Sequence, residues 1–323
     1  MKYYIGKLGQ KLVFNRDSSL ANRSNTNGNV GAYTFFNLLI ECMKDDVFVS
    51  CFNDDLENSE YLKQHSNIKK NKIENDGIGI FMLGMVYDAD FYQHIEMLNK
   101  TNLPYYIFCD DIRCLTSFSR LDIELTNLPV KIYGQSICTI YIKDKVYNVE
   151  YAPLEKTILY NAKSIDVKKT LDCIILANDS NNEYDRLSVV EKIVKDKIDV
   201  YGRLKKNQVY SKNFKGEVTY DESQLLLSSS YTTLVVPVSS KVITSKYIEA
   251  TINGTFPIFH HDYLYEYADF NNKVVISTYE ELMNALKNKE KMYEQVQNER
   301  TRLLEKYSSG IELVKEFKQL IGG

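Results

Sequence analysis

Short apolar runs alternate with helical repeats of apolar positions along the first third of the chain. Apolar runs typical of buried strands occupy residues 2–5, 47–50, 78–84 and 105–108. Between them, residues 31–43 and 91–98 carry apolar side chains at helical spacing, such as Phe91, Ile95 and Leu98. This order predicts a parallel, doubly wound α/β sheet, in which ligands bind beyond the carboxyl ends of the strands.

Two polar stretches interrupt this pattern. Residues 15–29 contain almost nothing to bury, and a loop of that length in a compact domain is either functional or disordered. Residues 69–72 hold three lysines, and we predict a basic, solvated bend there.

The same alternation returns after residue 170. Strands are predicted at residues 171–177, 198–202, 214–218, 233–238, 256–259 and 274–276. Helices are predicted at residues 188–195, 223–231 and 246–254. We interpret residues 151–168 as the linker, so the chain divides into two Rossmann-like domains, at 1–160 and 165–302, that face a central cleft.

The C-terminal part has the pattern of helices. Ser277 or Thr278 is predicted to cap a long helix, with Glu280 and Glu281 completing a capping box, and Gly310 separates the apolar helical faces that follow. One interpretation is a coiled-coil arm. We expect instead that a helix at about 303–323 returns to pack on the first domain.

Composition narrows the class of protein. The length of 323 residues suits two domains, and a net charge of −3 does not by itself indicate nucleic-acid binding. Six cysteines without a Cys-x-x-Cys pair indicate reduced thiols rather than a disulfide framework or a zinc site. Because no apolar run reaches membrane-spanning length and no signal pattern opens the chain, we expect a soluble, cytoplasmic protein without a membrane partner.

One helix and the strand after it carry the most specific pattern. Gly254 stands where a helix C-cap requires a left-handed residue, and Pro257 follows where the helix cannot continue. Thr244 and Ser245 place hydroxyl groups at the helix start, where free backbone N–H groups favour an anion. Glu249 could accept both hydroxyls of a ribose there. The alternative is an ordinary capped helix with a solvated glutamate, and the spacing alone favours neither.

The spacing from Glu249 through Gly254 to Pro257 resembles the donor-site segment of two-domain GT-B glycosyltransferases. Within that class, the chain resembles the DNA β-glucosyltransferases of T-even bacteriophages over most of its length. The segments that carry this resemblance, in the same order and at similar spacing, are 105–113, 168–172 and 243–249. The resemblance implies the GT-B fold and a nucleotide-sugar-dependent hexosyltransferase.

The resemblance places Asp111 on the general base of the family. A hydroxyl acceptor loses its proton as it attacks the anomeric carbon, so a carboxylate must lie within hydrogen-bond reach. Asp110 competes for this role because the register is uncertain by one residue, and at least one of the two caps the following turn. Arg113 either positions the acceptor or forms a surface ion pair with Asp111.

The resemblance also aligns Glu249 with the glutamate that binds the ribose in this family and Lys246 with the residue that contacts the diphosphate. The family has an arginine where this chain has Lys246, and a lysine side chain lacks the bidentate fork of a guanidinium. The other predicted donor-binding residues are Thr244, Ser245, Arg186 and Gly202. The family supplies further arginines from the loop that corresponds to residues 178–186, where Arg186 is the one basic residue, and this departure leaves catalytic activity open. Residues that could compensate are Arg16, Arg23 and Lys241.

No metal site and no required cofactor are predicted. Asp88-Ala89-Asp90 opens a helix and suits an N-cap, and His260-His261-Asp262 follows a strand and has the pattern of a loop. Lys241 stands eight positions before Glu249, where many retaining GT-B enzymes carry a second glutamate. Together with the candidate base Asp111, this absence favours inversion at the anomeric carbon, and the resemblance implies a UDP-sugar as donor substrate.

For the acceptor, the resemblance implies a hydroxymethylated pyrimidine in double-stranded phage DNA, with glucose as the transferred sugar and the host cytoplasm as the location. A base inside a duplex must be flipped out to be reached. Arg113, Arg16 and Arg23 are predicted to contact this acceptor, with the lysines of residues 69–72 as a basic rim. The alternatives are a GT-B transferase with a small-molecule, glycan or protein acceptor, a non-catalytic DNA- or partner-binding relative, and a sugar-nucleotide epimerase.

Overall fold

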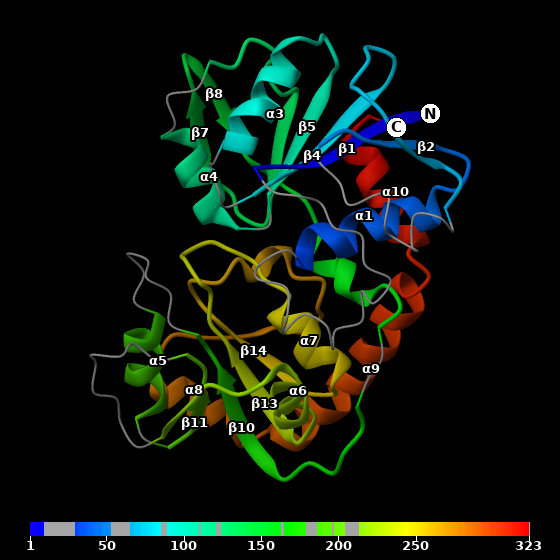
Figure 1. Ribbon diagram of the computed structural model, residues 1–323. Helices are drawn as coiled ribbons and strands as arrows, with labels where there is room; N and C mark the ends of the chain where they lie inside the picture. Colours follow the sequence, from blue (N-terminus) through cyan, green and yellow to red (C-terminus); the bar gives the residue numbers. More distant parts are fainter. Residues whose placement is uncertain are drawn as a thin grey trace. The chain divides into compact units, whose positions relative to one another are not determined.

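The computed structural model describes residues 1–9, 30–52, 65–84, 89–109, 111–120, 124–162, 165–178, 186–195, 197–203 and 213–322 (Figure 1). The chain divides into two compact units. The first combines Met1–Tyr160 with Gly310–Gly323, and the second is Asn161–Ser309. None of the helices formed by the described residues combines the length and the apolarity that crossing a bilayer requires.

The first unit is built on a parallel sheet. Across the described residues its strands, from one edge to the other, are β3 (Ile68–Lys70), β2 (Val47–Ser50), β1 (Lys2–Leu8), β4 (Ile78–Leu83), β5 (Tyr105–Cys109), β6 (Lys131–Gly134) and β9 (Glu150–Tyr151). Each neighbouring pair is parallel. Successive strands are added on one side of β1 and then on the other, so the strand order reverses beside β1 and β4. Ligands of doubly wound sheets bind at the carboxyl ends of the strands near such a reversal.

Helices cover both faces of this sheet, which explains why its central strands are continuously apolar. Among its described residues, the helical elements of this unit are α1 (Val30–Cys42), α3 (Ala89–Asn99), α4 (Ile112–Ser119), the 3-10 helix η3 (Leu154–Leu159) and α10 (Ile311–Leu320). Side chains alternate along a strand. In β5, Ile107 therefore packs in a core with Phe91 of α3 and Phe118 of α4, whereas the Phe108 ring lies 5.2 Å from the ring of Phe35 on α1.

The predicted return of the C-terminal helix to the first unit is confirmed. Helix α10 packs beside α1 (Figure 1), with the rings of Phe35 and Phe317 4.8 Å apart and edge to face. At its end, the hydroxyl group of Tyr133 donates a hydrogen bond of 2.5 Å to the carbonyl oxygen of Leu320. The last helix therefore contributes to the same core as the first.

The second unit contains another parallel sheet. In the part of the chain that the structure describes, its strand order is β12 (Phe214–Gly216), β11 (Asp199–Tyr201), β10 (Leu171–Leu176), β13 (Ser230–Val235), β14 (Phe256–His260) and β15 (Val274–Ile276). Its helices are α5 (Arg186–Val194), α6 (Tyr220–Ser228), α7 (Lys246–Ile252), α8 (Tyr279–Leu286) and α9 (Lys289–Tyr307). The parallel pairing matches the second doubly wound sheet predicted from the sequence.

Two local predictions were wrong, and a third was right only in part. Part of the basic bend at residues 69–72 belongs to strand β3, which pairs with β2 at the edge of the sheet and exposes its lysines. The stretch 151–168, predicted as a linker, does contain the division between the two units, after Tyr160, but its first part includes η3, whose residues are all buried and which packs on α1. The long helix capped by Thr278 ends at Leu286, and α9 begins two residues after Lys287.

A hairpin extends the first unit beyond the elements predicted from sequence. Strands β7 (Thr139–Ile142) and β8 (Lys145–Asn148) pair antiparallel around a two-residue turn. Lys143 in this turn has φ of 52°, the left-handed conformation that such a tight turn requires. The hairpin packs against α4 and so supports the helix that follows β5.

Candidate functional site

Glu249 is the centre of a polar cluster at the start of α7. Its side chain is 4% exposed, and both carboxylate oxygens accept hydrogen bonds from neighbouring side chains. Ser245 Oγ donates to Oε1 over 2.7 Å, and Lys246 Nζ donates to Oε2 over 2.9 Å. The structure thus brings together three of the predicted donor-binding residues, and Glu249 is not the solvated glutamate of the alternative interpretation.

The loop before α7 uses its polar groups differently from the prediction. Ser245 is the N-cap residue, but its hydroxyl group is directed to Glu249 and forms no capping bond. The backbone N–H of Thr244 donates to the hydroxyl oxygen of Tyr263 over 2.7 Å, and that hydroxyl donates to the Thr244 carbonyl over 2.6 Å. The Thr244 hydroxyl group lies 3.4 Å from that of Tyr263, so both hydroxyl groups predicted at the helix start are engaged within the protein.

The C-terminal end of α7 is anchored by a buried amide network. Asn253 donates through Nδ2 to Gln224 Oε1 over 2.7 Å and accepts at Oδ1 from Ser228 Oγ over 2.8 Å. Gly254 follows with φ of +64°, the left-handed cap predicted from its position. Because both ends of this short helix are held, the position of Glu249 is set by the fold rather than by helix propensity.

Lys169 approaches the same end of α7. Its ammonium donates to the Asn253 carbonyl over 3.2 Å and to Thr255 Oγ1 over 3.3 Å. Burial, reinforced by the nearby Arg300, lowers the pKa of Lys169 to about 8. Burial disfavours the charged form of this lysine, and the ammonium nevertheless supports the turn after α7. Lys169 therefore has a structural role beside the predicted donor residues.

Arg186 lies at the carboxyl edge of the same sheet, with its guanidinium directed to backbone carbonyls. It is 5% exposed and donates to the carbonyl oxygen of Val236 over 2.7 Å and to that of Asn178 over 3.4 Å. These carbonyls follow β13 and β10, so Arg186 joins the ends of two neighbouring strands. Residues 179–185, which connect Asn178 to Arg186, lie outside the described part of the chain.

Gly202 allows the chain after β11 to pass close to β10. A Cβ atom at this residue would stand 2.2 Å from the carbonyl oxygen of Ala177, and the residue has φ of +151°. Only glycine tolerates that combination. Gly202 and Arg186 therefore shape the carboxyl edge where the predicted donor site lies.

In the first unit, Asp111 follows β5 and caps α4. Its Oδ1 accepts a hydrogen bond from the backbone N–H of Arg113 over 2.9 Å, and both carboxylate oxygens accept from Arg113 Nε, each over 2.9 Å. The Asp111 side chain is 18% exposed and that of Arg113 is 45% exposed. The ion pair of Arg113 with Asp111 is observed, and the contact of Arg113 with an acceptor stays a prediction. Asp110, Arg16 and Arg23 lie outside the described residues.

A pocket that the sequence did not predict lies at the carboxyl ends of β2 and β3. It has a volume of about 350 Å³, and its lining includes Lys70, Lys72, Phe52 and His94. The rings of Phe52 and His94 stack at 4.1 Å, and the backbone N–H of Gly9 donates to His94 Nδ1 over 3.2 Å. The lysines were identified from the sequence, but His94 is a single histidine on a helix and gave no such signal.

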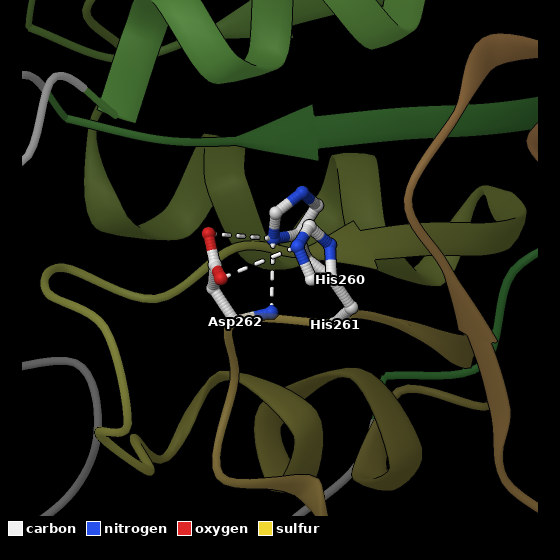
Figure 2. A group of neighbouring side chains, drawn as sticks. All are labelled: His260, His261 and Asp262. Atoms are coloured by element: carbon white, nitrogen blue, oxygen red, sulfur yellow. Dashed lines mark hydrogen bonds and ion pairs between the residues drawn. The ribbon is translucent and has the colours of Figure 1, made fainter.

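One group of described residues combines the side-chain types that bind metal ions. His260, His261 and Asp262 place one ligand atom each within 4.8 Å of one another at the end of β14 (Figure 2). His260 is 3% exposed, and burial lowers its pKa to about 4. The imidazole is therefore neutral at physiological pH, as metal coordination requires.

Comparison with known proteins shows what fold the chain shares. No protein-family model and no curated protein matches the sequence. Among solved structures, the DNA-modifying enzyme β-glucosyltransferase, with and without uridine diphosphoglucose, matches with a TM-score of 0.67 and 16% identity over 100% of each chain. T4 phage BGT in complex with UDP-glucose matches with a TM-score of 0.64 and 16% identity over 99% of each chain.

A more distant match extends the comparison to another glycosyltransferase. AviGT4, from avilamycin A biosynthesis, matches with a TM-score of 0.54 and 11% identity over 100% of this chain and 98% of its own. The chain therefore has the fold of GT-B glycosyltransferases, as predicted from the sequence.

Proposed function

We propose that the protein is an inverting glycosyltransferase that moves glucose from UDP-glucose to a hydroxymethylated pyrimidine in DNA. The observation that carries this proposal is the buried carboxylate of Glu249, held between Ser245 Oγ and Lys246 Nζ at the helix where the sequence predicts the ribose site. The fold shared with a β-glucosyltransferase and with T4 phage BGT bound to UDP-glucose supports the choice of donor and reaction.

Glu249 and Lys246 divide the binding of the nucleotide between them. The carboxylate would accept hydrogen bonds from the ribose hydroxyl groups, each of its oxygens having two lone pairs. The Lys246 side chain is 38% exposed, and its ammonium has three N–H donors, one of which is used on Glu249. The others are available to the diphosphate, whose negative charge grows as the bond to the sugar breaks.

Asp111 is proposed as the base that activates the acceptor. The hydroxymethyl oxygen attacks the anomeric carbon, the bond from that carbon to the diphosphate oxygen breaks, and the hydroxyl proton passes to the carboxylate. Arg113 holds this carboxylate through Nε, and the backbone N–H of the same residue fixes its Oδ1. This pairing orients Asp111 at the end of β5. Because each carboxylate oxygen already accepts two N–H groups of Arg113, one of these hydrogen bonds must be replaced when the proton is taken up.

The pocket beside β2 and β3 suits the flipped nucleotide. Its volume of about 350 Å³ is in the range of small-molecule sites. Its lining includes the rings of Phe52 and His94, which are buried and stack on each other, so this side of the pocket is preformed. Lys70 and Lys72 are exposed beside it and would take the phosphates that flank the extruded nucleotide.

A GT-B transferase acting on a different acceptor is the second candidate. The observation that favours it is the net charge of −3, which provides no overall attraction to DNA. A non-catalytic relative is favoured by the engagement of Arg186 with backbone carbonyls, because that guanidinium is the one basic group of the loop where the family has several arginines.

The proposal is tested by measuring UDP release from UDP-glucose. We expect release with DNA that contains 5-hydroxymethylcytosine and only slow hydrolysis with the same DNA unmodified. Release with a glycan or small hydroxylated molecule in place of DNA would support the second candidate. If no acceptor supports turnover, and neither UDP nor UDP-sugars stabilise the protein, the non-catalytic relative is the remaining interpretation.

A further inference from the structure

Two imidazoles and a carboxylate face one another where β14 ends (Figure 2). His260 Nδ1 lies 3.6 Å from Asp262 Oδ2, and His261 Nε2 lies 3.3 Å from Asp262 Oδ1. His260 is the last residue of the strand, so the three side chains come from a strand end and the turn that follows it. The three residues are consecutive in sequence, and their ligand atoms lie within 4.8 Å of one another.

These separations suit a tetrahedral metal ion. Bonds of about 2.0–2.2 Å from a tetrahedral ion to nitrogen and oxygen ligands place two ligands about 3.3–3.6 Å apart. The two separations in this cluster fall in that interval, but each involves a different oxygen of Asp262. Because the three ligand atoms lie within 4.8 Å of one another, a rotation of the carboxylate would direct one oxygen toward both rings. We propose that His260, His261 and Asp262 bind one divalent transition-metal ion, with zinc as the preferred metal and a fourth position open to water or an anionic oxygen.

His260 Nδ1 and Asp262 Oδ2 lie 3.6 Å apart, which is too far for a hydrogen bond between them. The backbone N–H of Asp262 donates to His260 Nδ1 over 3.2 Å, so this nitrogen carries a lone pair rather than a proton. Nδ1 and the carboxylate oxygen Oδ2 therefore face each other as two acceptors. A cation between them removes this repulsion and replaces the long bond from the amide.

The donor set and its exposure favour a transition metal. Imidazole nitrogens select zinc, nickel, cobalt or copper over magnesium and calcium, which prefer oxygen ligands. The His261 side chain is 54% exposed and that of Asp262 is 30% exposed, so an ion can enter from solvent. His260 is buried and would form the fixed side of the site.

The cluster is tied to the loop that precedes the predicted donor residues. The backbone N–H of Lys241 donates to the Asp262 carbonyl over 2.8 Å, and that of Leu264 donates to the Val242 carbonyl over 3.3 Å. Tyr263, the next residue after the cluster, is bonded to Thr244 as described above. An ion at this turn would therefore hold the loop from Lys241 to Ser245, a role that goes beyond the proposed transfer reaction.

Metal titration of the full chain, stripped with a chelator and free of a histidine tag, tests the site. With Co²⁺ we expect the visible absorption of a tetrahedral cobalt centre at one ion per chain, displaced by Zn²⁺. His261→Ala and Asp262→Asn should each lower the affinity at least about tenfold, since each removes a ligand. The matched control His65→Ala removes another of the four histidines and should bind as the unaltered chain does.

The outcomes separate this proposal from the transferase function. Absence of binding at millimolar Zn²⁺ and Co²⁺ would overturn it, as would equal affinity in the unaltered chain and both ligand variants. Circular dichroism of the two variants establishes that they are folded, which is expected because both side chains reach solvent. Glu249→Gln should retain the metal affinity, so loss of the donor site and loss of the metal site are distinguishable.

Discussion

Lys246 Nζ donates a hydrogen bond of 2.9 Å to the buried Oε2 of Glu249, three residues along α7. The cationic group predicted to bind the diphosphate is thus held by the carboxylate predicted to bind the ribose. A change at one of these residues alters the other, because neutralising Glu249 leaves the ammonium without its anionic partner. Their effects on nucleotide binding should therefore be non-additive in a double-mutant cycle.

Glu249→Gln should weaken the binding of UDP about tenfold to a hundredfold, since a hydrogen bond to a charged group contributes about 1.5–3 kcal/mol. Isothermal titration calorimetry with UDP measures this loss. Glu290→Gln, on the exposed start of α9, is the matched control and should bind UDP normally. Unchanged UDP affinity in Glu249→Gln would remove the donor site from α7.

Asp111→Asn should lower the rate of glucose transfer by about 10²–10⁴-fold, because the amide cannot accept the proton of the acceptor. Asparagine is as good an N-cap as aspartate, so α4 should remain folded and Tm should change little. Single-turnover kinetics with hydroxymethylated DNA provide the measurement. Asp144→Asn in the β7–β8 turn controls for loss of a surface charge, and equal rates in both variants would assign the base elsewhere.

Lys169 predicts a pH dependence of stability. Its folded-state pKa, about 8, lies below the usual 10.5, so the unfolded chain binds the extra proton between these values. The free energy of unfolding from this group therefore rises as the pH increases from about 8 to 10.5 and is constant below that window. Urea titrations across the window should show a shallower rise in Lys169→Met. A parallel dependence in the two proteins would contradict the prediction.

Gly202→Ala should destabilise the protein by at least about 2 kcal/mol, because the new methyl group meets the Ala177 carbonyl oxygen. Gly216→Ala is the matched control. It also has positive φ, at +88°, but its added Cβ has no heavy atom within 4 Å, so only backbone strain of about 1 kcal/mol is expected. Urea denaturation gives both values, and similar losses would show that the close approach at Gly202 is easily relieved.

Lys70→Ala and Lys72→Ala should each weaken DNA binding and reduce the slope of log affinity against log salt by about 1. Both lysines are exposed beside the pocket in the first unit. Fluorescence anisotropy with a short duplex across a salt series measures the slope. Lys145→Ala, on the exposed β7–β8 hairpin, is the control. If all three variants share one slope, the pocket is not the place where DNA phosphates bind.

Local signals predicted much of the fold. The left-handed Gly254 after α7 and the capping box from Thr278 to Glu281 are both present where their sequence patterns place them. The buried strands at residues 78–84 and 105–108 are also observed, because a strand covered on both faces must be apolar throughout. These features depend on residues that are close together in the sequence, so they can be predicted from a single sequence.

Other elements depended on partners distant in sequence. Strand β3 exposes Lys69 and Lys70, so no alternation of apolar and polar residues marks it, and its pairing with β2 makes it a strand. The 3-10 helix η3 is buried through its contact with α1, about a hundred residues earlier in the chain. Such elements are decided by packing, which a local pattern does not encode.

The sequence by itself determined the alternation of the central strands with helices, the left-handed end of α7 and the residue types available for chemistry. Only the tertiary structure decided which partner each polar group takes: Ser245 bonds to Glu249, Arg186 bonds to the carbonyls after β10 and β13, and His260 faces Asp262. The physical reason is that hydrogen bonds and metal coordination require matched distances and directions. Those are set by side-chain torsions and by backbone segments far apart in the chain.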